Sequence, residues 1–123
     1  YLFVNKGFGM SPGKLAAQVA HAAVEAYIQS NEELAKDWRE GGHYTKLVMQ
    51  ARDTEHLETI QKYIEDRGFK CARIIDEGRT EIPTHSFTAL GVEIVDKAES
   101  HTFKTFSSFE LYKPSYTVTV TWE

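Results

Sequence analysis

Apolar and polar residues recur along this chain with two different spacings. Four short runs rich in β-branched, aromatic and other apolar residues predict strands, at residues 1–4, 44–51, 71–75 and 88–95. Three stretches with the residue preferences or apolar spacing of helices predict helices, at residues 14–27, 31–39 and 53–67. Strands that alternate with helices indicate an α/β fold in which at least some strands pair in parallel. Residues 96–112 favour neither state, and residues 116–122 alternate in a way that indicates an additional strand or an extended tail.

The first predicted helix carries strong local signals. Ser11 is suited to the N-cap, and Pro12 to the first helical position, where its missing N–H costs nothing. Nearly all other side chains of this helix are alanine, valine or leucine, which predicts a largely buried helix with one narrow polar stripe. At about 100° per residue, four polar residues share that stripe: Lys14, Gln18, His21 and Glu25.

Composition places the chain among ordinary globular domains. Its 123 residues are 41% apolar and 26% charged, which predicts one domain with one core. The single cysteine, Cys71, excludes an intrachain disulfide. No apolar run approaches the roughly 20 residues that span a bilayer, and no leader pattern opens the chain, so we expect a soluble protein of the cytoplasm without membrane contact.

The charge balance disfavours a broad nucleic-acid-binding surface. The net charge is −4, whereas proteins that bind nucleic acid through its phosphates are usually basic. Any anion site is therefore local. The five histidines lack the spacing of a structural zinc site, so we expect no metal.

The glycine-rich connection before the first helix is the first candidate site. A strand, such a loop and a helix together can bind an anion at the helix N-terminus. The phosphate-binding P-loop pattern fails because positions 8 and 15 are Phe8 and Leu15, and the dinucleotide pattern fails at Pro12. Two interpretations of Lys14 stay open. It belongs to a solvated helix edge, or it lies beside the positive helix end in order to face a phosphate or a developing oxyanion.

The segment from Asp76 to Thr80 is the second candidate site. It follows a predicted strand, at the place where α/β sheets usually carry functional groups. Asp76 and Thr80 offer a carboxylate and a hydroxyl to one pocket, and Arg79 offers an anion clamp. The alternative is a turn that these same side chains stabilise.

Three motifs together resemble the type-2 peptidyl-tRNA hydrolase family, the archaeal and eukaryotic kind. They are MSPGKLAAQVAHA at residues 10–22, DEGRTEI at residues 76–82 and SFTALG at residues 86–91. The resemblance covers residues 1–112 and leaves residues 113–123 as a C-terminal extension. It implies a single three-layer α/β/α domain with a four-stranded mixed sheet, to which the extension adds a further strand in one interpretation.

The resemblance also implies an activity: cleavage of the ester between a peptide and the 3′ end of tRNA, which recycles the tRNA, without metal or cofactor. The family's catalytic residues fall on Lys14, Asp76 and Thr80 of this sequence. A further set is expected to contact the substrate: Lys6, Gln18, His21, Arg79, Ser86 and Thr88. The expected partner is peptidyl-tRNA, and a homodimer is allowed for.

Two other functions stay open. One is a catalytically idle member of the same fold that binds tRNA or a protein. The other is a small esterase whose substrate contains no nucleic acid, which suits the acidic charge better. The sequence departs from the family pattern in the loop before Gly13, where Lys6 is the only basic residue, and at Val92, where the family often has a Gly-Pro element.

Overall fold

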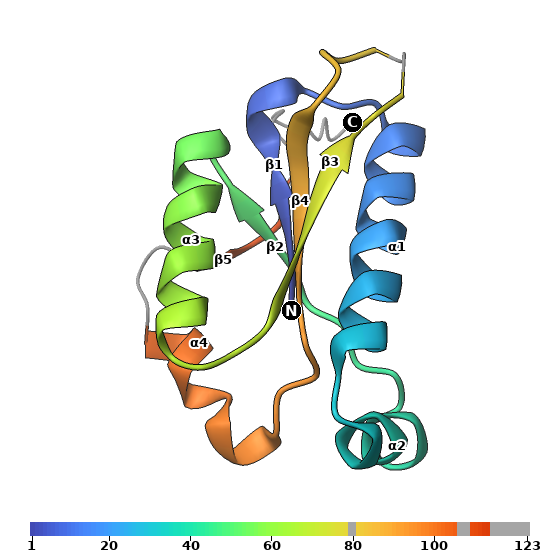
Figure 1. Cartoon of the computed structure of the whole chain (residues 1–123), viewed down its shortest axis with the longest axis vertical. Coiled ribbons are helices and arrows are strands. Elements are labelled where there is room, and N and C mark those ends of the chain that lie inside the picture. The colour runs from blue at the N-terminus through green and yellow to red at the C-terminus, as the bar shows by residue number, and fades with distance from the viewer. Residues whose placement is uncertain (79–80, 106–108, 114–123) are drawn as a thin grey trace, which may run out of the picture.

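The computed structural model describes residues 1–78, 81–105 and 109–113, and these ranges form a layered α/β structure (Figure 1). In chain order the elements are β1 (Leu2–Asn5), η1 (Lys6–Phe8), α1 (Pro12–Gln29), α2 (Glu32–Glu40), β2 (Val48–Ala51), α3 (Thr54–Asp66), β3 (Cys71–Asp76), β4 (Ser86–Val92), η2 (Lys97–Glu99), α4 (His101–Thr105) and β5 (Glu110–Leu111). The predicted α/β class is confirmed.

The strands form one mixed sheet in the order β3-β4-β1-β2-β5. β1 and β2 are parallel, and the other three pairings are antiparallel. α1 and α2 lie on one side of the sheet, and α3 and α4 on the other (Figure 1). This arrangement matches the expected three layers. The sheet has a fifth, C-terminal strand, but this strand is β5; residues 116–122, where we expected it, lie outside the described residues.

Helix starts follow the capping signals of the sequence. The Ser11 hydroxyl accepts a hydrogen bond from the Lys14 N–H, the Asn31 side chain accepts from Glu33 and Leu34, and the Asp53 carboxylate accepts from His56. Each contact satisfies a backbone donor that has no partner inside the helix. The predicted N-caps Ser11 and Asn31 are confirmed, and Asp53 caps α3.

Strand boundaries differ from the prediction by one residue in β1 and β3 and by more in β2 and β4. β2 begins at Val48, four residues later than expected; Tyr44, the first residue of the predicted strand, has a positive φ angle of 57°, which a strand does not allow. β4 covers Ser86–Val92, two residues earlier than expected at its start and three earlier at its end. The unassigned residues 96–112 contain η2, α4 and β5.

The core has one part on each face of the sheet. Beneath α3 and α4, large side chains pack together, among them Phe3, Leu57, Ile60, Leu90 and Phe103. Beneath α1 the packed residues are smaller: Leu2, Ala22, Ala72, Ile74 and Ala89. At Gly91 the helix lies almost directly on β4, because a Cβ atom there would be 2.3 Å from the Ala22 carbonyl oxygen. This contact places α1, and with it the first candidate site, against the sheet.

The predicted burial of α1 is wrong. The helix forms an outer layer, so only one face contacts the sheet, and its buried residues are Gln18, Ala22 and Ala26. Val24 and Ile28 on the outer face are 57% and 68% exposed. The apolar composition reflects alanine's helix preference as much as burial. In the part of the chain that the structure describes, no helix combines the length and apolar character needed to cross a membrane.

Candidate active site

A buried ion pair joins the two candidate sites of the sequence. The Lys14 Nζ atom, in the first turn of α1, lies 2.9 Å from Asp76 Oδ1 at the end of β3. The two side chains are 13% and 5% exposed. The interpretation of Lys14 as part of a solvated edge is therefore wrong, since its ammonium group is held against a buried carboxylate.

The backbone around Asp76 orients this carboxylate. Asp76 pairs with Ser86 across β3 and β4, after a register shift between Ile74 and Ile75. Asp76 Oδ1 also accepts a hydrogen bond from the Gly78 N–H at 3.1 Å, and the Asp76 carbonyl accepts one from the His85 N–H at 2.6 Å. Hydrogen bonds to the ionised form favour the charged carboxylate that pairs with Lys14.

Gln18 lies one helical turn after Lys14, and its side chain is hydrogen-bonded to β4. Its Nε2 atom donates to Thr88 Oγ1 at 2.6 Å, and the Thr88 hydroxyl donates to the Ile74 carbonyl at 3.3 Å. Gln18 is 8% exposed, and Thr88 has no exposed surface. The contacts of the buried Thr88 hydroxyl hold Gln18 in place. Gln18 and Thr88 are therefore hydrogen-bonded to each other in this structure, and Gln18 stays one helical turn from Lys14.

The remaining predicted binding residues that the structure describes each make separate contacts. Ser86 is buried, and its hydroxyl donates to the Pro83 carbonyl. His21 is half-exposed and lies 3.7 Å from Glu25. Lys6 points to the C-terminal segment, where its ammonium group donates to the Lys113 carbonyl at 2.7 Å. Arg79 and Thr80 lie outside the described residues.

Two charged residues near these segments did not stand out in the sequence. Glu81 accepts hydrogen bonds from the Ser11 N–H at 2.9 Å and from the Ser11 hydroxyl at 2.8 Å. Arg52 follows β2 and lies beside η1, since a Cβ atom on Gly7 would be 3.3 Å from the Arg52 carbonyl oxygen. The available signal for Glu81 was its place directly after Thr80; nothing local in the sequence connects it with Ser11.

The Glu81 contact bears on the anion hypothesis for the start of α1. A carboxylate of the chain itself already accepts a hydrogen bond from the Ser11 N–H, directly before the first turn of α1. A phosphate and a developing oxyanion would both meet a like charge at this point, so the contact favours neither of the two anions considered for Lys14.

Two other kinds of site, a reactive cysteine and a metal site, receive little support from the described residues. Burial raises the pKa of the Cys71 thiol to about 12, so the reactive thiolate is scarce at neutral pH. Within residues 1–78, 81–105 and 109–113, no group of three or more histidine, cysteine, aspartate or glutamate side chains is placed to hold a metal ion.

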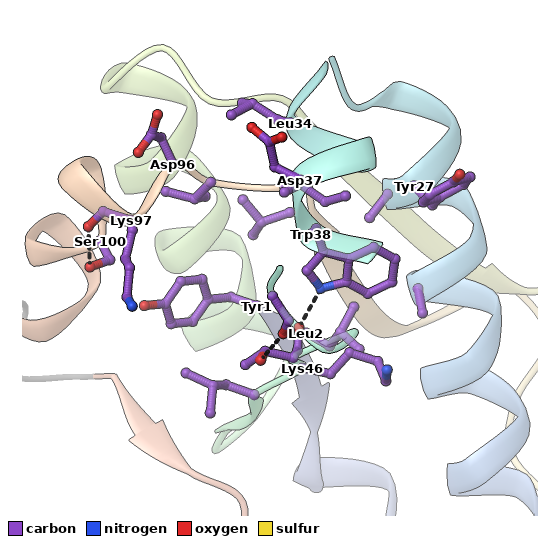
Figure 2. A pocket seen from close by; sticks show the side chains of 18 of the residues that line it. Tyr1, Leu2, Tyr27, Leu34, Asp37, Trp38, Lys46, Asp96, Lys97 and Ser100 are labelled. Carbon is purple, nitrogen blue, oxygen red and sulfur yellow. Dashed lines mark hydrogen bonds between the residues drawn. The ribbon is translucent and has the colours of Figure 1, made fainter. Parts of the chain in front are cut away.

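A cavity of about 670 Å³ lies at the other end of α1 (Figure 2). Its lining includes Ala26, Tyr27 and Trp38, and the Trp38 indole donates to the Thr45 carbonyl at 2.7 Å. Ala26 is roughly 18 Å along the helix from Lys14, at 1.5 Å per residue. None of the described residues that we predicted for the site lines this cavity.

Fold and site together define an α/β protein whose candidate centre pairs a buried lysine with a buried aspartate between a helix start and a strand end. Residues 1–111 match the family described as peptidyl-tRNA hydrolase PTH2. The chain belongs to this family, as the sequence motifs indicated.

Relatives from animals, fungi and archaea support the assignment. The chain is 38% identical over 108 residues to "Peptidyl-tRNA hydrolase 2, mitochondrial" of Bos taurus, covering 81% of this chain and 60% of that protein. It is 42% identical over 95 residues to "Probable peptidyl-tRNA hydrolase 2" of Schizosaccharomyces pombe, covering 74% and 45%. It is 35% identical over 108 residues to "Peptidyl-tRNA hydrolase" of Thermococcus onnurineus, covering 81% and 91%. The match thus spans less than two thirds of the bovine and fission-yeast proteins.

Proposed function

We propose that this chain hydrolyses the ester bond between the peptide and the tRNA 3′ end in peptidyl-tRNA. The observation that carries the proposal is the 2.9 Å pair of Lys14 and Asp76, both largely buried, which are two of the residues that the resemblance implies to be catalytic. The names of the relatives support the same substrate. An idle member of the fold would have no reason to keep these two charges together at the cost of burying them.

The proposed reaction needs a water, a base and a cation. Water attacks the ester carbonyl carbon, and the carbonyl oxygen becomes an oxyanion that the Lys14 ammonium group stabilises. The bond to the 3′ oxygen of tRNA then breaks, and that oxygen takes up a proton. Asp76 orients Lys14 or accepts the proton of the water, and Thr80 holds the water. These residues carry the reaction without a metal or cofactor in this proposal, so dialysis against a chelator leaves the rate unchanged.

Further residues are proposed to bind the substrate. Gln18 and His21 continue from Lys14 along α1, and Ser86 lies at the start of β4, beside Asp76 in the sheet. Lys6 and Arg79 are proposed to bind tRNA phosphates.

Release of a blocked amino acid from tRNA tests the proposal. The purified chain is incubated with an N-blocked aminoacyl-tRNA, and the released acylated amino acid is measured against time. We expect release, with a KM that rises steeply with added salt because phosphate contacts displace counterions. A chain that cleaves small activated esters but leaves the tRNA ester intact would support the small-esterase alternative instead.

A homodimer and a cytoplasmic location complete the proposal. The outer face of α1 offers Val24 and Ile28 as exposed apolar side chains for a second copy. Sedimentation equilibrium of wild type and Ile28→Glu tests the dimer, which the variant should weaken. The bovine and human relatives are named mitochondrial, so fractionation of the source cells is the test of location.

A further inference from the structure

Glu81 connects the two segments that carry the candidate catalytic residues. One carboxylate oxygen accepts from both the N–H and the hydroxyl of Ser11, at 2.9 and 2.8 Å. The Ser11 hydroxyl in turn accepts from the backbone N–H of Lys14 at 3.5 Å. A chain of hydrogen bonds therefore runs from Glu81 to the backbone of Lys14, between segments about 70 positions apart in the sequence.

Several contacts of the described residues between β3 and β4 lie within that connection. The Gly78 N–H donates to Asp76, Glu77 pairs with His85 at 3.0 Å, and the Pro83 carbonyl accepts from Ser86. These contacts shape the connection. Two contacts link it to α1: the Lys14–Asp76 pair at its start, and the Glu81–Ser11 contact, which lies three residues before Lys14 and one residue after Thr80.

We propose that Glu81 is a positioning residue, which ties the connection after Asp76 to the first turn of α1 so that Lys14 and Asp76 act on one ester. The inference rests on the proposed function and adds a residue to it. The simpler role for such a carboxylate is a helix cap, which stabilises α1 through the helix dipole. A cap alone predicts a lower melting temperature and an unchanged kcat per folded molecule, so kinetics separate the two roles.

Variants of Glu81 and Ser11 test the positioning role. Glu81→Ala removes the acceptor and should lower kcat about tenfold with less than about a twofold change in KM, because misplacement affects the transition state more than binding. Glu81→Gln keeps a carbonyl oxygen that accepts hydrogen bonds, so kcat should stay within about threefold of wild type. The double variant Ser11→Ala with Glu81→Ala should have a kcat no lower than that of the less active of the two single variants, since the two residues share one contact.

Glu77→Ala is the matched control. Glu77 is an exposed carboxylate of the same connection, but its ion-pair partner, His85, lies within the connection. The kcat of Glu77→Ala should stay within about twofold of wild type. A Glu81→Ala enzyme with wild-type kcat, additive losses in the double variant, or an equal loss in Glu77→Ala would each overturn the positioning role.

Amide hydrogen exchange measures the restraint without any substrate. Residues 77–85 and the first turn of α1 should exchange at least about fivefold faster in Glu81→Ala than in wild type, because their shared contact is gone. Exchange at the wild-type rate would overturn the inference whether or not the chain is active. An inactive wild-type chain would instead contradict the proposed function, so the two failures are distinguishable.

Discussion

At the scale of single residues, the site depends on two charges that stabilise each other. Removing a charge from water costs several kcal/mol, and a nearby opposite charge offsets most of that cost only when geometry is good. Lys14 and Asp76 meet this condition at 2.9 Å, and the Gly78 N–H provides a further hydrogen bond. The pair is therefore a preorganised unit, and its two members should not act independently in catalysis.

The first prediction concerns Asp76. Asp76→Asn keeps the shape and removes the charge, so kcat should fall by about 10²-fold or more while KM changes little. The double variant with Lys14→Ala should be little worse than the more damaged single variant, as expected for groups that act as one unit. Steady-state kinetics on the blocked aminoacyl-tRNA provide the measurement. Losses that multiply in the double variant would show two independent contributions.

The second prediction concerns His56, which is 7% exposed. Its Nδ1 accepts from the Arg52 N–H, and its buried Nε2 has no hydrogen-bond partner among the described residues. Burial, followed by the charge of Arg52, lowers the pKa of His56 below its ordinary value of 6.5. The unfolded state therefore binds the proton more readily, and stability should decrease as the pH falls below about 6.5.

The matched variants are His56→Asn and His43→Asn. His56→Asn keeps an acceptor for Arg52 but does not titrate, so its melting temperature should fall less than that of wild type between pH 7.5 and 5.5. His43 is exposed, and its replacement should leave the wild-type slope. Equal slopes in wild type and His56→Asn would show that another group controls this pH range.

At the scale of elements, local capping signals predicted the helix starts correctly, whereas the burial of α1 was predicted wrongly. Capping at Ser11, Asn31 and Asp53 involves residues two or three positions apart, so the sequence contains all the information. The start of β2 depends on the turn at His43 and Tyr44, whose positive φ angles no residue-type pattern indicated. The exposed face of α1 was missed because alanine and valine occur both on the face that packs against the sheet and on the face that is exposed to solvent.

The third prediction tests how α1 packs on the sheet. A methyl group at Gly91 would lie 2.3 Å from the Ala22 carbonyl oxygen, which is backbone and cannot simply rotate away. Gly91→Ala should lower the free energy of unfolding by about 1–3 kcal/mol, the usual cost of overpacking. Gly13→Ala is the control: nothing lies within 4 Å of its Cβ position, and stability should stay equal or rise slightly. Similar melting temperatures for both variants would contradict the close contact.

At the scale of the whole molecule, the site forms from segments that only the fold brings together. Lys14 and Asp76 are 62 positions apart, and motif resemblance rather than spacing identified them as partners. The same resemblance indicated Thr88, but its full burial depends on how β4 packs beneath α1. Glu81 was missed because its partner Ser11 is remote in sequence, and its role depends on a contact that only the tertiary structure contains.

The fourth prediction concerns the C-terminal extension. The family match ends at residue 111, and we propose residues 1–112 as the domain and residues 113–123 as the extension. A chain that stops after Tyr112 should stay folded and active, although it loses the Lys113 carbonyl that accepts from Lys6. Melting temperature and kcat of the truncated chain are compared with those of the full chain. Loss of soluble protein or a large fall in melting temperature would show that the extension belongs to the core.

The most direct test of the central claim is kcat of Lys14→Ala on a blocked aminoacyl-tRNA. If Lys14 stabilises the oxyanion, kcat should fall by about 10²–10³-fold, the loss typical of one removed oxyanion donor. Lys62→Ala is the matched control, because Lys62 also lies 2.9 Å from an aspartate, Asp66, but on the exposed surface of α3. The account predicts near-normal kcat for Lys62→Ala and the large loss for Lys14→Ala. A folded Lys14→Ala enzyme with near-normal kcat would contradict it.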